Sequence, residues 1–242
     1  LFGLALGLTD SIDEYKSILE YQPNIITIDV ANGYTKNLLD RCYEVRLLLD
    51  RYSPKTRLMS GNVATLEGVI NLANAGVHIV RVGIGNGAEC STTNVTGIGR
   101  PIISALMECS NRSEYSLYSD KKILICADGG IKNSGDFVKA IVAGADVCMG
   151  GALFAQSYES TNDLIIYGQA SKKLQEMRGT QIKSIEGFER IVTKTQSLAN
   201  FINDFSYGIR SAGTYLDAHN LSDIRKHGRF VIAGRNTIKK EY

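Results

Sequence analysis

The 242-residue sequence has no apolar run near the ~18 residues that a membrane-spanning helix needs. Residues 1–8 are apolar, but no basic residue precedes them and no small-residue cleavage site follows, which disfavours a signal peptide. The sequence also lacks an excess of one charge, because its formal net charge is +2 and its lysines and arginines are evenly spread. These absences exclude the basic surfaces that bind nucleic acid or membranes, so we expect neither as a partner.

The cysteines lack a pairing pattern. They number five and form no C-x-x-C pair, which argues against both a disulfide framework and a zinc site. The three histidines share no metal-ligand spacing either. The sequence therefore predicts a protein of a reducing compartment, and we expect it in the cytoplasm.

What the sequence does have is an alternation of short apolar segments and amphipathic helical stretches over its first two thirds. We predict strands at residues 1–6, 25–30, 56–61, 77–83, 123–127 and 146–150. Helical patterns lie between them at residues 13–20, 35–52, 66–75, 101–110 and 134–143. Near-continuous apolar strands separated by helices indicate a parallel sheet that helices cover.

The loops after the strands favour a barrel over an open dinucleotide-binding sheet. Polar and glycine residues follow several strands, as at residues 29–33 and 128–130, and in a barrel such loops share the face that carries active sites. The run of glycines at 83, 85 and 87 lacks the G-x-G-x-x-G spacing and we expect no helix directly after it, which excludes the Rossmann motif. We therefore predict an α/β fold, a (β/α)8 TIM barrel that forms a single catalytic domain over residues 1–242. Six strands do not close eight, so we expect two N-terminal βα units to be missing before Leu1.

The last third of the sequence departs from this alternation. Residues 158–195 are polar, contain glycine and are weakly periodic, which predicts a long mobile excursion, called the flap below. Helices are expected at residues 197–205 and 221–227, and a short edge strand at residues 230–232.

One loop carries the clearest chemical signal. Residues 83–93, called the Cys loop below, contain three glycines, Cys90 and several hydroxyl residues directly after an apolar strand. Glycines let the backbone wrap closely round a ligand or an ion. A thiol presented by such a loop is well placed to be a nucleophile.

With this loop, several segments resemble the IMP dehydrogenase/GMP reductase family from residue 8 to residue 232. The matching segments read DVANGY at 29–34, GNVAT at 61–65, DGG at 128–130, MGG at 149–151 and YGIRS at 207–211. The first of them is similar to the reductase form. The resemblance implies a GMP reductase, an oxidoreductase of purine metabolism that converts GMP to IMP and ammonia with NADPH.

The resemblance also implies roles for three catalytic residues. Cys90 would attack C2 of the purine and form a covalent thioimidate as the amino group leaves. Thr92 and Glu186 match the family's proton-handling pair, which delivers the proton that ammonia needs. Glu186 is matched through IEG at residues 185–187, within the flap.

Further positions match those that contact ligands in the family. The substrate-contacting positions are Asp128, on the ribose, and Gly129, Gly130, Gly150, Gly151, Gly168, Gln169 and Ala170. The cofactor-contacting positions are Asp29, Val30, Ala31, Ile84, Gly85, Gln169, Ser211, Ala212, Gly213 and Thr214, the last four across a subunit boundary of an expected homotetramer. The backbone carbonyls of Gly85, Gly87, Cys90 and Thr93 match a metal site for a monovalent cation, usually K⁺.

Two other functions stay open. An IMP dehydrogenase would use Cys90 in the NAD-dependent oxidation of IMP to XMP and would hydrolyse the intermediate with a flap arginine, yet neither Arg178 nor Arg190 lies in the expected motif. A nucleotide-binding subunit without turnover is the other alternative, because Asn86 and Ala88 stand where the family usually has proline and serine.

Overall fold

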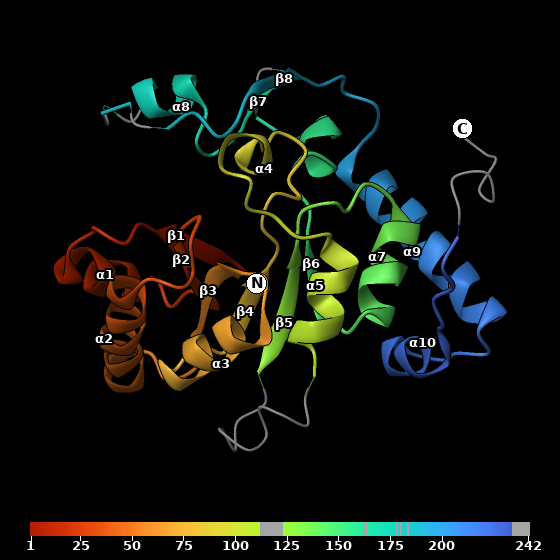
Figure 1. The fold of residues 1–242 in the computed structure, drawn as a ribbon, viewed down its shortest axis with the longest axis horizontal. Helices are drawn as coiled ribbons and strands as arrows, with labels where there is room; N and C mark the ends of the chain where they lie inside the picture. The colour runs from red at the N-terminus through yellow and green to blue at the C-terminus, as the bar shows by residue number, and fades with distance from the viewer. Residues whose placement is uncertain (112–122, 162–163, 178, 180, 183, 234–242) are drawn as a thin grey trace.

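The computed structural model describes residues 1–111, 123–161, 164–177, 179, 181–182 and 184–233. Its centre is a six-stranded parallel sheet, shown in Figure 1. The strands are β1 (Gly3–Leu6), β2 (Ile25–Asp29), β3 (Arg57–Val63), β4 (Ile79–Val82), β5 (Leu124–Asp128) and β6 (Val147–Met149). The six predicted strands are therefore confirmed.

The helices predicted between the strands are also confirmed. They are α1 (Ile12–Leu19), α2 (Lys36–Tyr52), α3 (Leu66–Asn74), α5 (Ile102–Cys109) and α7 (Ser134–Val142). Polar side chains cap most of their first turns. Glu14 N donates to the Ser11 hydroxyl while the Glu14 carboxylate accepts from Ser11 N, which is a capping box. Thr35, Thr65 and Asn133 each accept a first-turn N–H in the same way.

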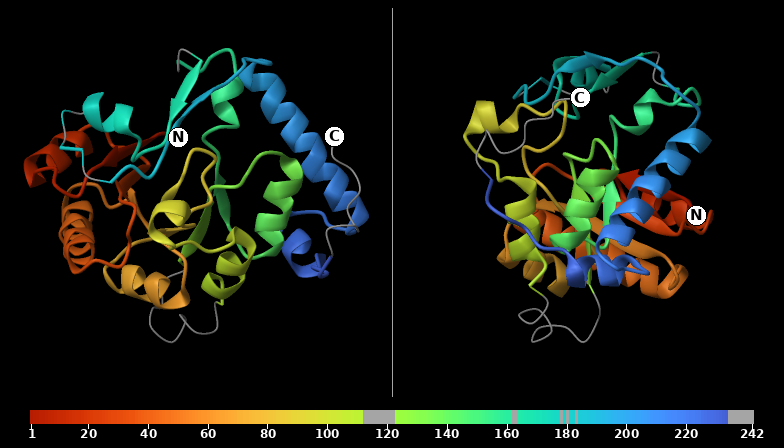
Figure 2. Two further views of the ribbon diagram at one scale, coloured as in Figure 1. Left: turned by 45° about the horizontal axis from the view of Figure 1, so that its top comes forward. Right: turned by 90° about the vertical axis from the view of Figure 1, so that its right-hand side faces the viewer.

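The strands lie in sequence order from β1 to β6. A dinucleotide-binding sheet reverses its order at a switch point, so this order is that of a barrel wall. Alternate residues face two cores. Leu58 and Val80 belong to the large core under the helices, whereas Met59, Ile79 and Cys126 form a smaller cluster on the other face. Figure 2 shows the helices along one side of the curved sheet.

Within the described residues the barrel wall is an open arc. Its outer strands β1 and β6 each pair with one neighbour only, so six strands stand where a closed barrel of this type has eight. The α/β barrel class is confirmed, and the part of it described in this chain is the six-stranded arc.

The flap contains short elements that its weak periodicity did not predict. β7 (Ile165–Tyr167) pairs with β8 (Glu189–Ile191) in an antiparallel ribbon, and α8 (Lys172–Met177) lies between them in the sequence. In Figure 1 these elements lie above the sheet, on the side of the carboxyl ends of its strands. A short 3₁₀ helix, η1 (Phe154–Gln156), precedes the flap. Positions 162–163, 178, 180 and 183 of the flap lie outside the described residues.

Three predictions about the later elements need correction. The helix expected at 197–205 extends further as α9 (Leu198–Tyr215), while α10 (Leu221–His227) is as predicted. The predicted edge strand at 230–232 is wrong, because these residues form no strand and Val231 and Ile232 are exposed. A short helix, α4 (Thr92–Thr96), follows the Cys loop where none was expected, and Gly97 ends it in the left-handed conformation at φ 72°.

None of the described helices is both long enough and apolar enough to cross a membrane.

Candidate functional site

The Cys loop contacts the loop after β5 at the carboxyl end of the sheet. Gly83 lies so close to the carbonyl oxygen of Asp128 that a Cβ would collide with it, and its φ is 146°. A Cβ on Gly129 would lie 2.7 Å from the carbonyl carbon of Asn86, and its φ is 88°. Both positions therefore require glycine, and the two loops form one surface.

The Cys90 thiol lies at the end of this surface beside a hydroxyl. Its Sγ–H donates to Oγ1 of Thr92 at 3.2 Å, and both residues are partly buried. Thr92 is the first residue of α4, so the short helix fixes the position of its hydroxyl. The structure thus brings together two of the three predicted catalytic residues.

Glu186, the third predicted catalytic residue, reaches the Cys loop through its backbone. Its carbonyl accepts a hydrogen bond from Ser91 N at 2.9 Å, and Phe188 N donates to the carbonyl of Glu89 at 3.1 Å. Between these bonds, Cys90 and Gly187 pair as an antiparallel bridge. The Glu186 carboxylate is partly buried, and in the described part of the chain it makes no hydrogen bond to Thr92. The flap segment 186–188, which directly precedes β8, therefore pairs with the backbone of the Cys loop at Cys90.

A second flap segment, residues 168–171, pairs with residues 186–188 from their other side. Gly168 N donates to the carbonyl of Phe188 at 3.0 Å, and Glu186 N donates to the carbonyl of Ala170 at 3.2 Å. A Cβ on Gly168 would lie 2.7 Å from the carbonyl oxygen of Glu89, so only glycine fits there. The predicted substrate positions Gly168 and Ala170 are therefore beside the Cys loop.

An ion pair joins the two sequence regions through side chains. Nε of Arg190, in β8, lies 2.8 Å from Oε1 of Glu89, the residue before Cys90. Sequence reasoning assigned no role to Glu89.

Arg81 organises the interior of the carboxyl end of the sheet. Its guanidinium donates to Asp29 Oδ1 at 2.5 Å and to Asp128 Oδ2 at 2.6 Å, which links β4 to β2 and β5. Asn62 also donates to Asp128 Oδ2, at 2.8 Å. Burial lowers the pKa of Arg81, but the charges of Asp128 and Asp29 raise it further, so the net pKa lies above the usual value.

Arg81 and Asn62 were missed by sequence reasoning, although both lie in or beside predicted strands. The available signal was a single charged residue, Arg81, in the otherwise apolar strand β4. The Nε of Arg81 and the Oδ1 of Asn62 are buried without a hydrogen-bond partner among the described residues. A spare donor and a spare acceptor therefore lie beside the two predicted ligand-binding aspartates.

Burial disfavours the thiolate form of the other four cysteines. Burial raises the pKa of Cys42 to about 11 and that of Cys109, Cys126 and Cys148 to about 12. All five cysteines are free. Since the thiolate is the nucleophile, these four groups remain inert near neutral pH.

The remaining predicted contact positions divide into two groups. Gly130 has a φ of 79° and follows Gly129 at the end of β5, while Gly150 and Gly151 follow β6 and precede η1. These glycines, with Val30, Ala31 and Ile84, belong to loops at the carboxyl end of the sheet, and Asp29 is the last residue of β2. Residues 211–214 lie in the last turns of α9, which in Figure 1 runs away from the flap towards α10. Within this chain, they are not part of the Cys90 surface.

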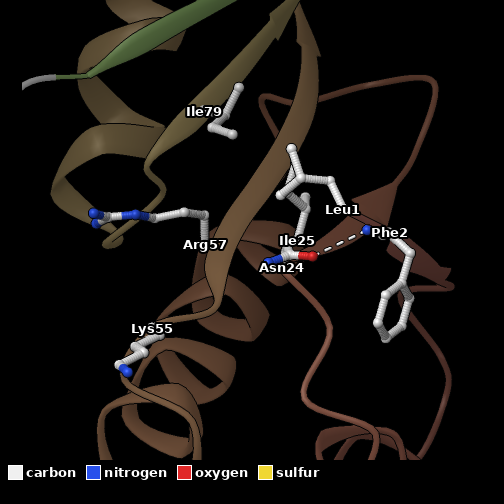
Figure 3. Close-up of a pocket in the computed structure, with 8 residues that line it drawn as sticks. Leu1, Phe2, Asn24, Ile25, Lys55, Arg57 and Ile79 are labelled. Atoms are coloured by element: carbon white, nitrogen blue, oxygen red, sulfur yellow. Dashed lines mark hydrogen bonds between the residues drawn. The ribbon is translucent and has the colours of Figure 1, made fainter.

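Two described cavities lie elsewhere. One of about 400 Å³ is at the amino ends of the strands and is lined by Leu1, Phe2, Asn24, Ile25, Lys55, Arg57 and Ile79, with Phe2 N donating to Asn24 Oδ1 at 3.0 Å (Figure 3). The other, of about 570 Å³, lies between the end of α9 and the start of α10. Neither is lined by Cys90.

No group of three or more His, Cys, Asp or Glu side chains among the described residues converges as a metal site. The cation position predicted in the Cys loop would use backbone carbonyls instead. Of these, the carbonyl of Gly87 accepts from Cys90 N at 3.2 Å and that of Thr93 from Gly97 N at 2.9 Å. A cation would therefore bind through the second lone pair of each.

Comparison with known proteins gives a consistent result. The model of the "IMP dehydrogenase / GMP reductase domain" matches residues 1–241. The chain is 31% identical to an inosine-5'-monophosphate dehydrogenase of Chlorobaculum parvum over 95% of its length and 49% of that protein. It is 34% identical to a GMP reductase of Shewanella halifaxensis over 86% of its length and 61% of that protein.

A solved structure has the same fold over nearly all of this chain. It is a GMP reductase variant from Trypanosoma brucei in complex with guanosine 5'-monophosphate, with a TM-score of 0.87 and 26% sequence identity. The match covers 98% of this chain and 51% of that one. The chain thus spans about half to three fifths of the length of these relatives.

Proposed function

The chain belongs to the IMP dehydrogenase/GMP reductase family, and from this membership and its site we propose that it is the catalytic part of a GMP reductase. The proposed reaction is the reductive deamination of GMP to IMP and ammonia with NADPH. One catalytic domain over residues 1–242 would carry it, with a flap at 158–195.

One observation carries this proposal: the Cys90 thiol donates to the Thr92 hydroxyl at 3.2 Å, and the backbone on both sides of this thiol pairs with the flap segment that contains Glu186. A nucleophile, a hydroxyl and a carboxylate-bearing strand are the groups that thiol-mediated deamination needs. Cys90 and Thr92 lie two positions apart, and the backbone of the Glu186 segment joins them at the end of the sheet where barrel enzymes carry their active sites.

In the proposed reaction the Cys90 thiolate adds to C2 of GMP, and the bond between C2 and the 2-amino nitrogen then breaks. The nitrogen leaves as ammonia after taking a proton, and a thioimidate remains on Cys90. NADPH supplies the hydride that completes the reduction at C2. The bond between C2 and sulfur breaks in that reduction, so the Cys90 thiolate is restored and IMP is released.

Thr92 and Glu186 are proposed to manage the proton for ammonia. The Thr92 hydroxyl accepts a hydrogen bond from the Cys90 thiol, so it is placed to relay a proton at this point. Glu186 lies on the flap segment that precedes β8, held by the bond from Ser91 N to its carbonyl. We propose that its carboxylate turns towards Thr92 when the nucleotide binds.

The purine nucleotide is proposed to bind across the two glycine loops. Asp128 uses Oδ2 for Arg81 and Asn62, and its Oδ1 is proposed to accept from the ribose hydroxyls. The backbone N–H groups of Gly129, Gly130, Gly150 and Gly151 are proposed to contact the phosphate, with Gly168, Gln169 and Ala170 at the purine.

The surroundings of Asp29 fit a nicotinamide cofactor. Nε of Arg81 and Oδ1 of Asn62 have no partner among the described residues and are proposed to offer a donor and an acceptor to a polar group such as a carboxamide. Asp29, Val30, Ala31, Ile84, Gly85 and Gln169 are proposed to contact that side, and residues 211–214 of a second subunit the far end, in a homotetramer. The carbonyls of Gly85, Gly87, Cys90 and Thr93 are proposed to bind K⁺.

Arg190 favours the reductase over a dehydrogenase. Hydrolysis of the intermediate would need a free flap arginine to activate water, whereas Arg190 is paired with Glu89. Arg178 lies outside the described residues.

The test is turnover by the purified chain. We expect GMP-dependent oxidation of NADPH with release of ammonia, and no reduction of NAD with IMP. Cys90→Ala should lower this rate by more than about a thousandfold, because it removes the nucleophile. Cys148→Ala is the matched control, a thiol on β6 with no proposed role, and should retain the rate. Activity in Cys90→Ala would contradict the covalent mechanism, and GMP binding without turnover would favour the binding subunit.

A further inference from the structure

We propose that Glu89 and Arg190 are a positioning pair, which fixes β8 of the flap against the Cys loop and thereby sets Cys90 and Thr92 in their reacting arrangement. This inference rests on the proposed function and assigns roles to two residues outside it. Neither residue is proposed to touch the substrate.

The pair lies where it can control the nucleophile. Glu89 directly precedes Cys90, and Arg190 is 101 positions later in the sequence. Their 2.8 Å contact lies beside the two backbone bonds that join the same segments, from Ser91 N to Glu186 and from Phe188 N to Glu89. Movement of Arg190 in β8 would therefore also move residues 186–188, the adjoining segment that pairs with the backbone at Cys90.

The backbone alone joins these segments weakly. Cys90 and Gly187 form an isolated bridge rather than a ladder, so few hydrogen bonds fix the register of the flap over the thiol. Isolated pairings of this kind open readily. A side-chain contact beside the bridge adds the constraint that a longer ladder would otherwise supply.

The Glu89 carboxylate is mostly buried, so it depends on its partner more than the carboxylate of an exposed salt bridge does. The Glu89 side chain is 14% exposed and that of Arg190 is 40% exposed. A mostly buried carboxylate needs its counter-charge, because water compensates it little once the partner is removed. The exposed part of Arg190 still leaves the pair sensitive to salt.

The experiment compares five forms of the full chain: wild type, Glu89→Gln, Arg190→Met, the double variant and Arg190→Lys. We expect each single neutral variant to lower kcat about fivefold, as expected for loss of a contact of this kind, with little change in KM for GMP. The double variant should be no slower than either single one, because the two side chains act together. Arg190→Lys keeps the charge and should recover most of the rate.

The matched control is Glu189→Gln, which removes an exposed carboxylate one residue away on the same strand. It should behave as wild type. Added salt should slow the wild type towards the rate of the double variant and leave the double variant unaffected. Wild-type kcat in both single variants, additive losses, or a rise in KM alone would each overturn the proposal.

A second measurement needs no substrate. Hydrogen exchange at the amides of Ser91 and Phe188 reports the two backbone bonds between the segments. Both amides should exchange faster in Glu89→Gln and Arg190→Met and at the wild-type rate in Arg190→Lys. If the wild type does not turn over GMP, the proposed function fails and this exchange alone decides on the pair. Unchanged exchange overturns the pair, whatever the kinetics show.

Discussion

At the residue scale, Arg81 is the side chain on which the carboxyl end of the sheet depends most. It is 9% exposed and neutralises both Asp29 and Asp128, which lie on strands to either side of its own. Two partly buried carboxylates that contact the same guanidinium would otherwise repel each other. Arg81 therefore fixes the orientation of both aspartates before any ligand binds.

Replacing Arg81 by methionine should lower the free energy of unfolding by about 3 kcal/mol, because two partly buried carboxylates lose their counter-charge. Urea unfolding of the variant measures this loss. Arg57→Met is the control, since Arg57 is an exposed arginine at the start of β3. A loss for Arg81→Met no larger than for Arg57→Met would contradict the role given to the ion pairs.

Cys90 could be proposed from the sequence because the glycines that shape its loop are adjacent to it, and Thr92 because its segment resembles the family's. Arg81 could not, because its partners are 52 and 47 positions away. Only the register of β2, β4 and β5 brings these three side chains together. The roles given to Cys90, Thr92 and Glu186 remain predictions until turnover is measured.

At the scale of the elements, the contact between the flap and the Cys loop depends on two glycines. A Cβ on Gly168 would meet the carbonyl oxygen of Glu89 at 2.7 Å and Cα of Gly187 at 2.9 Å. Both neighbours are backbone atoms that cannot rotate away. The flap can approach the backbone of the Cys loop this closely only because Gly168 and Gly187 have no side chains at the contact.

Gly168→Ala should therefore displace the flap and lower kcat by about a hundredfold, the cost of a shift of roughly 1 Å at a catalytic group. The melting temperature should change little, because the large core lies under the helices and away from the flap. Steady-state kinetics and thermal unfolding measure the two effects. Glu189→Ala, an exposed change in β8, should alter neither. A large loss of stability with normal kcat would be the opposite of this expectation.

The helices between the strands were predictable because each has a local signal, such as the caps at Ser11 and Thr65. The flap elements were not. β7 and β8 have three residues each and are strands only because they pair with each other. A period cannot be recognised in so short a segment. The strand predicted at 230–232 failed for the converse reason, since an apolar run without a partner strand forms no sheet.

At the scale of the whole molecule, buried thiols link stability to alkaline pH. Burial raises the pKa of Cys42 to about 11 and of Cys109 and Cys126 to about 12, from 9.0. The folded chain therefore keeps protons that the unfolded chain releases near pH 9. The contribution of these thiols to the free energy of unfolding is therefore fully present below pH 9 and is lost as the pH rises towards their folded-state pKa values.

The expected loss is about 1.4 kcal/mol per buried thiol for each pH unit above 9. Urea unfolding at pH 8, 9 and 10 measures it. Cys42→Ala has one such thiol fewer, so its stability should fall less steeply over that range. Equal slopes for this variant and the wild type would show that Cys42 does not contribute to the loss.

The parallel direction of the strands was predictable, because near-continuous apolar strands joined by helices are typical of a parallel sheet. The contacts between the flap and the Cys loop were not predictable in this way. They depend on the curvature of the sheet and on the path of the flap over its carboxyl end. No local pattern contains that information.

The 101 positions between Glu89 and Arg190 also set an order of events during synthesis. Each strand of the arc needs only the preceding βα unit, so the early sheet can assemble while the ribosome is still adding residues. The flap segment that pairs with the Cys loop lies about a hundred residues later in the sequence. The chain between the two must therefore close into a long loop before they can contact each other. The nascent chain therefore passes through a stage in which the Cys loop has been made but the flap segment that pairs with it has not. Oxidants would reach Cys90 more readily at that stage than after the flap has paired with its loop, because thiol oxidation follows exposure.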